Sequence, residues 1–400
     1  MSFLLAVILA STVSAATGDC TPDSVDTPAL THHLGASVGY DYMTSSVSDD
    51  LREKTEGEDK VSDHSALPLH LRYSFTFTDP AIPNYFPGGY QGIGMGLMNI
   101  GFADSGGVGK ARRFIGYPTL VYVFQGGPFW NINSRLSLNY EWNFGASFGW
   151  KPLCDYNENY NLTVGSRVNA YLNLSLQLEY SITEKISLFG GLGVSHFSNG
   201  NTSWPNPGVN SFGARVGIKL TLNKVPEKIL PVVDDTVKKR KLQYDLTLWG
   251  ASRKRVYRGG DKPVLLNGHY ACAGVSFAPM LRLGRWWRVG GSADLQWDES
   301  SDLKKNYIEG SNADDIKFTR PSFGRQLSVG IAAHGELQMP VFAVNVGLGY
   351  NLLAPEENRG FYQNLTLKTY IGKKFYINVG YQLRNFNQQA HLMLGAGLTI

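Results

Sequence analysis

Apolar and polar residues alternate along two long stretches in the first half of the chain. In residues 135–150, RLSLNYEWNFGASFGW, every even-numbered position is apolar, whereas the odd-numbered positions are polar, charged or glycine. Residues 167–182 repeat the pattern, with Val168, Ala170 and a run of leucines at even positions. A period of two residues places alternate side chains on opposite faces of a β-strand. The sequence therefore predicts strands with one apolar and one polar face.

These strands are too long for an ordinary soluble sheet, in which a strand usually has about 5–6 residues. A strand that crosses a membrane as part of a β-barrel needs about 9–11 residues, with apolar side chains toward lipid and polar or small ones toward the lumen. The barrel has to close, because an open sheet edge would leave backbone groups without hydrogen bonds in hydrocarbon. We therefore predict an all-β protein, an antiparallel transmembrane β-barrel, in preference to a soluble β-sandwich.

Sixteen segments have this strand character, eight in each half of the chain. In the first half they lie near residues 32–43, 68–78, 90–103, 117–126, 134–150, 166–182, 185–198 and 210–223. In the second half they lie near residues 241–252, 268–283, 286–298, 325–338, 341–353, 364–372, 375–385 and 390–400. Short and long connections mostly alternate between the first eight, as periplasmic turns and extracellular loops do in outer-membrane barrels.

A charged segment with two prolines, KVPEKILPVVDDTVKKRK, separates the two halves at residues 224–241. We predict an eight-strand unit over residues 30–224, a linker over 225–240, and a second, degenerate eight-strand barrel-like unit over 241–400. The alternative is one barrel of about sixteen strands. The linker is longer than a periplasmic turn, which favours two units.

Residues 1–16 are predicted to be a secretory signal peptide, because residues 3–9 are apolar and the small residues of VSAA follow. No run of 18 apolar residues comes after them, so a helical membrane protein is not expected. A net charge of +4 over 400 residues gives no sign of a nucleic-acid partner, and three widely spaced cysteines match no metal-binding pattern. A signal peptide followed by barrel strands predicts a bacterial outer-membrane protein.

One strand end departs from the apolar pattern of its own face. In GVSHFSNGNTSWPNPGVN, residues 193–210, His196 and Ser198 continue the face that carries Leu188. We expect this face to point outward, toward lipid near the extracellular rim, and Asn210 to fall on the outer face of the next strand. A polar group in an apolar medium costs a few kcal/mol unless it is paired. A serine that attacks an ester needs a base within hydrogen-bond reach and a third group that orients the base, which these residues would supply.

The same stretch resembles the PagL-type lipid A 3-O-deacylases, an outer-membrane family of acyloxyacyl hydrolase-like enzymes. The matching elements are HFSNG at residues 196–200, PNPG at 205–208 and the position of residue 210, and the strand pattern matches over residues 30–224. The resemblance implies an eight-strand barrel with a Ser-His-Glu site on its outer, lipid-facing side. It also implies hydrolysis of an ester-linked acyl chain of lipid A, the lipid of lipopolysaccharide, without a metal or organic cofactor.

The resemblance also implies roles by position: nucleophile, Ser198; general base, His196; oxyanion hole, Asn206 with Asn199 or Gly200. Asn210 stands where the family has a glutamate. An asparagine can accept a hydrogen bond from His196 and fix its tautomer, but it cannot neutralise an imidazolium ion. We expect a Ser-His-Asn enzyme. The alternatives are a carboxylate from another part of the chain and a weakened or inactive site.

The other charged residues on polar faces predict filled lumens rather than further sites. His334 and Glu336 are expected to fill the lumen in the second half. An internal ion-pair network is expected in the first half from Arg135, Glu141, Arg167 and Glu179. The second half carries Leu383 near the position that corresponds to His196, has no His-x-Ser there, and is predicted to be non-catalytic. The second hypothesis for the whole protein is a non-catalytic outer-membrane barrel with a structural, transport or binding role.

Overall fold

The computed structural model describes most of both halves of the chain, namely residues 30–45, 64–80, 82, 84–104, 112–152, 164–204, 206, 208–223, 241–257, 264–266, 268–302, 307–308, 317–386 and 388–400. The predicted signal peptide and linker lie outside these residues. The described elements are strands and two short 3-10 helices, which confirms the all-β fold. Among the described residues, no helix is long and apolar enough to cross a membrane.

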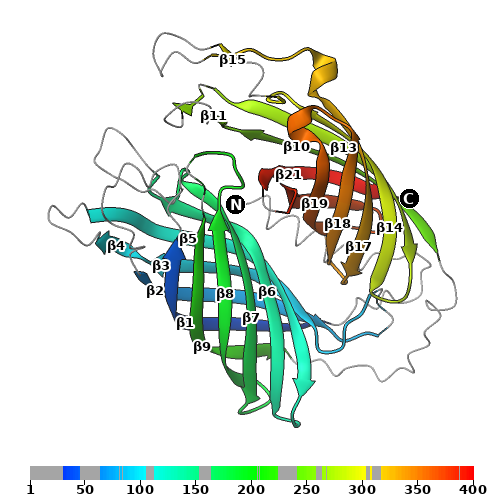
Figure 1. Cartoon of the computed structure of the whole chain (residues 1–400). Coiled ribbons are helices and arrows are strands. Elements are labelled where there is room, and N and C mark those ends of the chain that lie inside the picture. The colour runs from blue at the N-terminus through cyan, green and yellow to red at the C-terminus, as the bar shows by residue number, and fades with distance from the viewer. Residues whose placement is uncertain are drawn as a thin grey trace. The chain divides into compact units, whose positions relative to one another are not determined.

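The first barrel is an antiparallel ring of eight strands (Figure 1, blue to green). The strands are β1 (Leu30–Ser45), β2 (His64–Phe77), β3 (Tyr90–Asn99), β5 (Arg112–Asn131), β6 (Leu136–Trp150), β7 (Val168–Ser181), β8 (Ile186–Ser198) and β9 (Val209–Asn223). Each strand pairs with the next one in this order, and β9 pairs with β1 to close the ring. A short strand, β4 (Gly101–Asp104), pairs with the beginning of β5.

The second barrel is a separate closed ring (Figure 1, yellow-green to red). Its strands are β10 (Leu242–Arg253), β13 (Tyr270–Arg282), β14 (Trp287–Asp298), β17 (Leu327–Gln338), β18 (Phe342–Leu353), β19 (Gly360–Ile371), β20 (Phe375–Arg384) and β21 (Gln388–Thr399). The pairing of β10 with β21 closes it. The connections carry the two-residue strands β11 (Val256–Tyr257), β12 (Val264–Leu265), β15 (Tyr307–Ile308) and β16 (Lys317–Phe318), with the 3-10 helices η3 (Phe323–Gln326) and η4 (Glu356–Asn358).

Two barrels of eight strands are therefore present, and the alternative of one barrel with about sixteen strands is wrong. The reason is hydrogen bonding at the seams. The first and last strands of each half pair with each other, so that each ring has no edge left to pair with the other ring. The chain accordingly divides into two compact units, one for each barrel.

Burial follows the alternation that the sequence predicts. Along β7, the odd positions Asn169 to Gln177 are buried, whereas Leu174, Leu176 and Leu178 are about half exposed on the opposite face. The polar set therefore faces the lumen, and the apolar set forms the outside of the barrel. An outer surface of this kind is what a barrel presents to hydrocarbon.

The lumen of the first barrel is filled by charged and aromatic side chains. Arg72 forms an ion pair with Glu141 (2.5 Å between Nη1 and Oε1), and its guanidinium lies over the Phe124 ring. The Tyr90 hydroxyl donates to the same carboxylate at 3.1 Å. A buried ion pair persists only when both charges are paired and their remaining hydrogen bonds are satisfied, as they largely are here.

The predicted ion-pair network of the first lumen is wrong in part, because two of its four residues do not face the lumen. Glu141 and Glu179 do take part in ion pairs, but with Arg72 and Lys219. Arg135 and Arg167 are exposed. These two arginines directly precede β6 and β7, where the strand alternation has not yet begun, so their parity in the sequence does not place them in the lumen.

The lumen of the second barrel contains two buried cations that pair with two buried carboxylates. Arg288 contacts Asp245 (2.7 Å) and Glu336 (3.0 Å), and Lys368 contacts the same two carboxylates at 2.7 and 2.6 Å. His334 hydrogen-bonds to neighbouring lumen side chains. The prediction that His334 and Glu336 fill the lumen is confirmed.

Candidate functional site

The end of β8 carries His196 and Ser198 on the outside of the first barrel. Phe197, between them, is 2% exposed and packs in the lumen against Trp150 and Tyr171, with ring centroids 5.3 and 5.2 Å apart. A shift of one residue would move this ring out of the lumen, so its packing fixes the facing of its two neighbours. His196 and Ser198 are half-buried and continue the outer face of the strand.

Strand β9 brings Asn210 directly opposite His196 in the antiparallel register. Asn210 is exposed on the outer face, and its Oδ1 lies 2.7 Å from Nδ1 of His196. An amide oxygen is only an acceptor, so Nδ1 carries the proton and Nε2 of the neutral ring keeps its lone pair. This tautomer is the one that a general base needs, and Asn210 holds it without adding a charge.

Gly208, in the loop before β9, lies against the imidazole of His196. Gly208 precedes β9 with φ +81°, a conformation that favours glycine, and a Cβ at this position would lie 2.8 Å from Cε1 of His196. The backbone therefore passes directly against the edge of the ring. Any side chain at position 208 would push the imidazole away from its place.

The loop after β8 is tied back to the strand end by two asparagines. The Oδ1 atom of Asn206 accepts a hydrogen bond from the backbone N–H of Asn199 at 2.9 Å. The carbonyl of Asn199 in turn accepts from the hydroxyl of Thr202 at 2.8 Å. Gly200, with φ +62°, makes the turn out of the strand. The three residues predicted for an oxyanion hole, Asn199, Gly200 and Asn206, thus belong to one hydrogen-bonded loop.

Ser198 follows His196 by two residues on the outer face of β8. No hydrogen bond joins its hydroxyl to the His196 ring, both of which belong to the described part of the chain. Hydrogen bonds between nucleophile and base are often long without substrate and tighten only in the reacting complex. On the neighbouring strand β7, Ala170 pairs with Ser198 and Leu172 pairs with His196. The side chains next to the serine on that strand are therefore apolar, and the one directly opposite it is small.

The second barrel contains a Ser-His-Asn set that sequence reasoning missed. Nε2 of His334 lies 2.9 Å from the Ser292 hydroxyl, and Nδ1 lies 2.9 Å from Oδ1 of Asn345. The residues come from three different strands, so no spacing in the sequence could have joined them. The Ser292 hydroxyl also donates to the Asp294 carboxylate at 3.0 Å. A negative charge there opposes formation of an alkoxide, and these residues serve to fill the lumen.

In the described ranges, no group of three or more histidine, cysteine, aspartate or glutamate side chains has the arrangement of a metal site. At the end of β8 the described residues supply a hydroxyl, an imidazole with a hydrogen-bonded Nδ1 and a hydrogen-bonded loop.

Several solved structures are similar to parts or most of this chain at low sequence identity. Neisserial surface protein A is 9% identical with a TM-score of 0.30, over 48% of this chain and 97% of that one. A TodX mutant monoaromatic hydrocarbon channel is 10% identical with a TM-score of 0.19, over 98% and 93%. The toluene transporter TbuX of Ralstonia pickettii is 11% identical with a TM-score of 0.18, over 98% and 91%. No curated protein matches the chain closely enough to count as a relative.

Two family models match the two barrels. Residues 89–219 match the model described as lipid A 3-O-deacylase (PagL), a segment that contains His196, Ser198 and Asn210. Residues 242–400 match the model described as the C-terminal domain of acyloxyacyl hydrolase. The matched segments lie in both halves of the chain and include the strand end and loop described above. The chain belongs to the PagL lipid A 3-O-deacylase family.

Proposed function

We propose that this protein is a lipid A deacylase of the bacterial outer membrane, which hydrolyses an ester-linked fatty acyl chain of lipid A in the outer leaflet. One observation carries the proposal. An imidazole held by Asn210 in the tautomer of a general base lies beside Ser198, on the outside of a barrel that matches the PagL family.

The reaction begins when the Ser198 hydroxyl attacks the ester carbonyl while Nε2 of His196 takes its proton. The hydrogen bond from Nδ1 to Asn210 stabilises the ring as it becomes an imidazolium ion. The tetrahedral intermediate collapses, the bond between the acyl carbon and the alcohol oxygen of the ester breaks, and that oxygen leaves with the proton from His196. Water then repeats the sequence on the acyl-serine, which releases the fatty acid and restores the serine hydroxyl.

The oxyanion of the intermediate needs hydrogen-bond donors that are already in place. We assign this role to the amide group of Asn206, with the backbone N–H of Gly200. The backbone N–H of Asn199 is bonded to Asn206 and positions that side chain instead. The loop between β8 and β9 therefore forms the oxyanion hole.

The outward position of the site suits a substrate that is already in the membrane. Leu192 and Val194 of β8, with Phe212 of β9, are more than half exposed on the same outer face as the histidine. Acyl chains of lipid A would lie along these apolar side chains, with the ester near the rim at His196. The substrate would then reach the serine without leaving the lipid.

The test compares the purified, refolded full chain with its Ser198→Ala variant on lipid A in detergent, with product masses read by mass spectrometry. Loss of one hydroxyacyl mass with the wild type, and none with the variant, supports the proposal. Ser195→Ala is the matched control, because Ser195 lies on the same strand but faces the lumen. If no acid is released by folded wild-type protein, the structural or binding role replaces the enzymatic one.

A further inference from the structure

Arg167 is an exposed cation at the end of the first barrel that carries the proposed active site. It directly precedes β7, and its carbonyl accepts a hydrogen bond from the backbone N–H of Gly149 at 3.2 Å, which holds it against the end of β6. On the other side of β7, Ala170 pairs with Ser198 of β8. Arg167 therefore begins the strand next to the proposed nucleophile, at the rim where β8 ends.

The register of the two strands sets the distance between Arg167 and the serine. Arg167 lies beyond Ala170 toward the rim, and a rise of about 3.3 Å per residue separates it from the serine by roughly 10 Å along the strands. Neighbouring strands lie about 4.8 Å apart. A sugar that carries both an acyl ester and a phosphate can thus place the ester at the serine and the phosphate within reach of the long arginine side chain.

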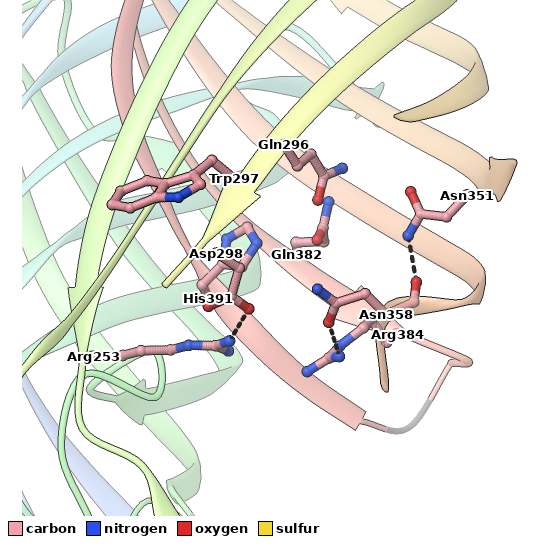
Figure 2. Close-up of a pocket in the computed structure, with 9 residues that line it drawn as sticks. All are labelled: Arg253, Gln296, Trp297, Asp298, Asn351, Asn358, Gln382, Arg384 and His391. Atoms are coloured by element: carbon pink, nitrogen blue, oxygen red, sulfur yellow. Dashed lines mark hydrogen bonds and ion pairs between the residues drawn. The ribbon is translucent and has the colours of Figure 1, made fainter. Parts of the chain in front are cut away.

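The guanidinium of Arg167 has no partner in the part of the chain that the structure describes, where no side chain forms an ion pair or a hydrogen bond with it. Arginines inside the lumens are different. Figure 2 shows two that line a small cavity of the second barrel: Arg253 is bonded to Asp298, and Arg384 to Asn358. The protein itself satisfies these lumen arginines, whereas Arg167 is left to interact with groups outside the protein.

The surroundings of Arg167 are those of the boundary between hydrocarbon and lipid headgroups. Val168, the next residue, is 49% exposed, and Phe148, its partner in β6, is 41% exposed. Apolar side chains of the outer face thus give way to a cation at the rim, as they do where a barrel leaves the hydrocarbon. The loop after Ser198 contains no charged residue at positions 199–208, so it supplies no counter-charge for an anionic headgroup.

We infer that Arg167 is a specificity-determining residue, whose guanidinium binds a phosphate of the lipid A headgroup and so places an ester of the same sugar at Ser198. The inference rests on the proposed function. A guanidinium offers parallel N–H donors that match the oxygens of a phosphate. Since Arg167 takes no part in bond making or breaking, its loss weakens binding of the substrate and leaves the chemical step unchanged.

The first measurement is the initial rate of fatty-acid release by the full chain in detergent micelles, with lipid A and with dephosphorylated lipid A as substrates. Arg167→Gln should raise KM for lipid A about threefold to fivefold, the scale of one exposed ion pair, and leave kcat unchanged. With the dephosphorylated lipid, the two proteins should have equal KM. Arg135→Gln is the matched control, because Arg135 is also exposed and directly precedes a strand, but at the opposite end of the barrel.

The second measurement removes hydrolysis and counts bound lipid by native mass spectrometry of the Ser198→Ala chain. This chain should prefer lipid A to the dephosphorylated lipid by the same factor, and a further Arg167→Gln change should abolish the preference. Arg167→Lys, which keeps the charge without the parallel donors, should retain part of it. Heat-dependent gel mobility establishes that each variant is folded.

The two measurements separate this inference from the proposed function. If the wild type releases no acid while the Ser198→Ala chain still prefers lipid A through Arg167, the hydrolase function fails and the phosphate contact stands. Equal affinity of the Ser198→Ala chain for the two lipids, or a preference that Arg167→Gln leaves unchanged, would overturn the inference. An equal rise in KM for both lipids would do the same, because the arginine would then not recognise the phosphate.

Discussion

The hydrogen bond between His196 and Asn210 is the feature by which this site can be tested most sharply, because residue 210 stands where the family resemblance implies a glutamate. The Asn210→Ala variant removes the 2.7 Å bond and leaves the strand pairing intact. Asn210→Asp keeps the shape of the side chain and adds a negative charge. The two variants therefore separate orientation of the base from charge stabilisation.

The expected loss in Asn210→Ala follows from the state that the bond stabilises. In the resting site both partners are neutral, and a neutral hydrogen bond contributes about 1 kcal/mol. In the transition state the ring is becoming an imidazolium ion, and a hydrogen bond to a charged group contributes about 1.5–3 kcal/mol. Only the difference between these two contributions, about 0.5–2 kcal/mol, raises the barrier. We therefore expect kcat/KM to fall about 2-fold to 30-fold, since about 1.4 kcal/mol corresponds to a factor of ten.

The expected gain in Asn210→Asp is smaller, because Asn210 is exposed. Two unit charges about 4 Å apart near a protein surface attract by about 4 kcal/mol before solvent exposure is considered. Measured exposed ion pairs contribute at most about 1 kcal/mol. We therefore expect Asn210→Asp to raise kcat/KM about fivefold, with less gain at high ionic strength because salt screens the pair.

The assay measures the initial rate of fatty-acid release from lipid A in micelles. Asn223→Ala serves as the control, because Asn223 is an exposed asparagine at the other end of β9. A value of kcat/KM for Asn210→Ala within twofold of the wild type would refute the reasoning, because the bond would then do nothing for the reaction. An Asn210→Asp variant no faster than the wild type would refute the charge argument alone.

Three further results are expected. Gly208→Ala should lower activity more than tenfold in a folded barrel, because the added Cβ would lie 2.8 Å from the His196 ring and the residue has a φ of +81°. Wild-type rates in this variant would show that Gly208 does not position the ring. Asn206→Ala should lower kcat about 10²–10³-fold with little change in KM, as loss of one oxyanion donor does, and an equal rise in KM instead would indicate a binding role. Glu141→Gln should lower the free energy of unfolding of the first barrel by about 3–5 kcal/mol, because the buried charge of Arg72 would lose its carboxylate partner. Urea unfolding curves that overlay those of the wild type would exclude this loss of stability.

Much of the fold could be predicted because strand periodicity is local. Each segment from β1 to β21 that builds a ring lies within a few residues of a predicted strand, and burial along β7 and β8 follows the alternation. The facing of His196 and Ser198 could be predicted for the same reason. Two residues separated by one on a strand share a face in any sheet, whatever the strand pairs with.

Pairing could not be predicted in this way, because it depends on residues far apart in the chain. The number of barrels was decided by the contacts of β1 with β9 and of β10 with β21. Likewise, Glu141 pairs with Arg72 from another strand instead of with an arginine near it in sequence. Parity along one strand does not show which charges meet across a lumen.

The sequence by itself therefore determined the strands, their apolar outer faces and the face that His196 and Ser198 share, because each of these depends only on the order of residues within one strand. The tertiary structure alone decided which strands close each ring, that Asn210 lies directly opposite His196, and that Arg253 and Arg384 face one cavity in the second barrel. The physical reason is that register and ring closure are set by hydrogen bonds and packing between strands, for which a pattern along a single strand holds no information.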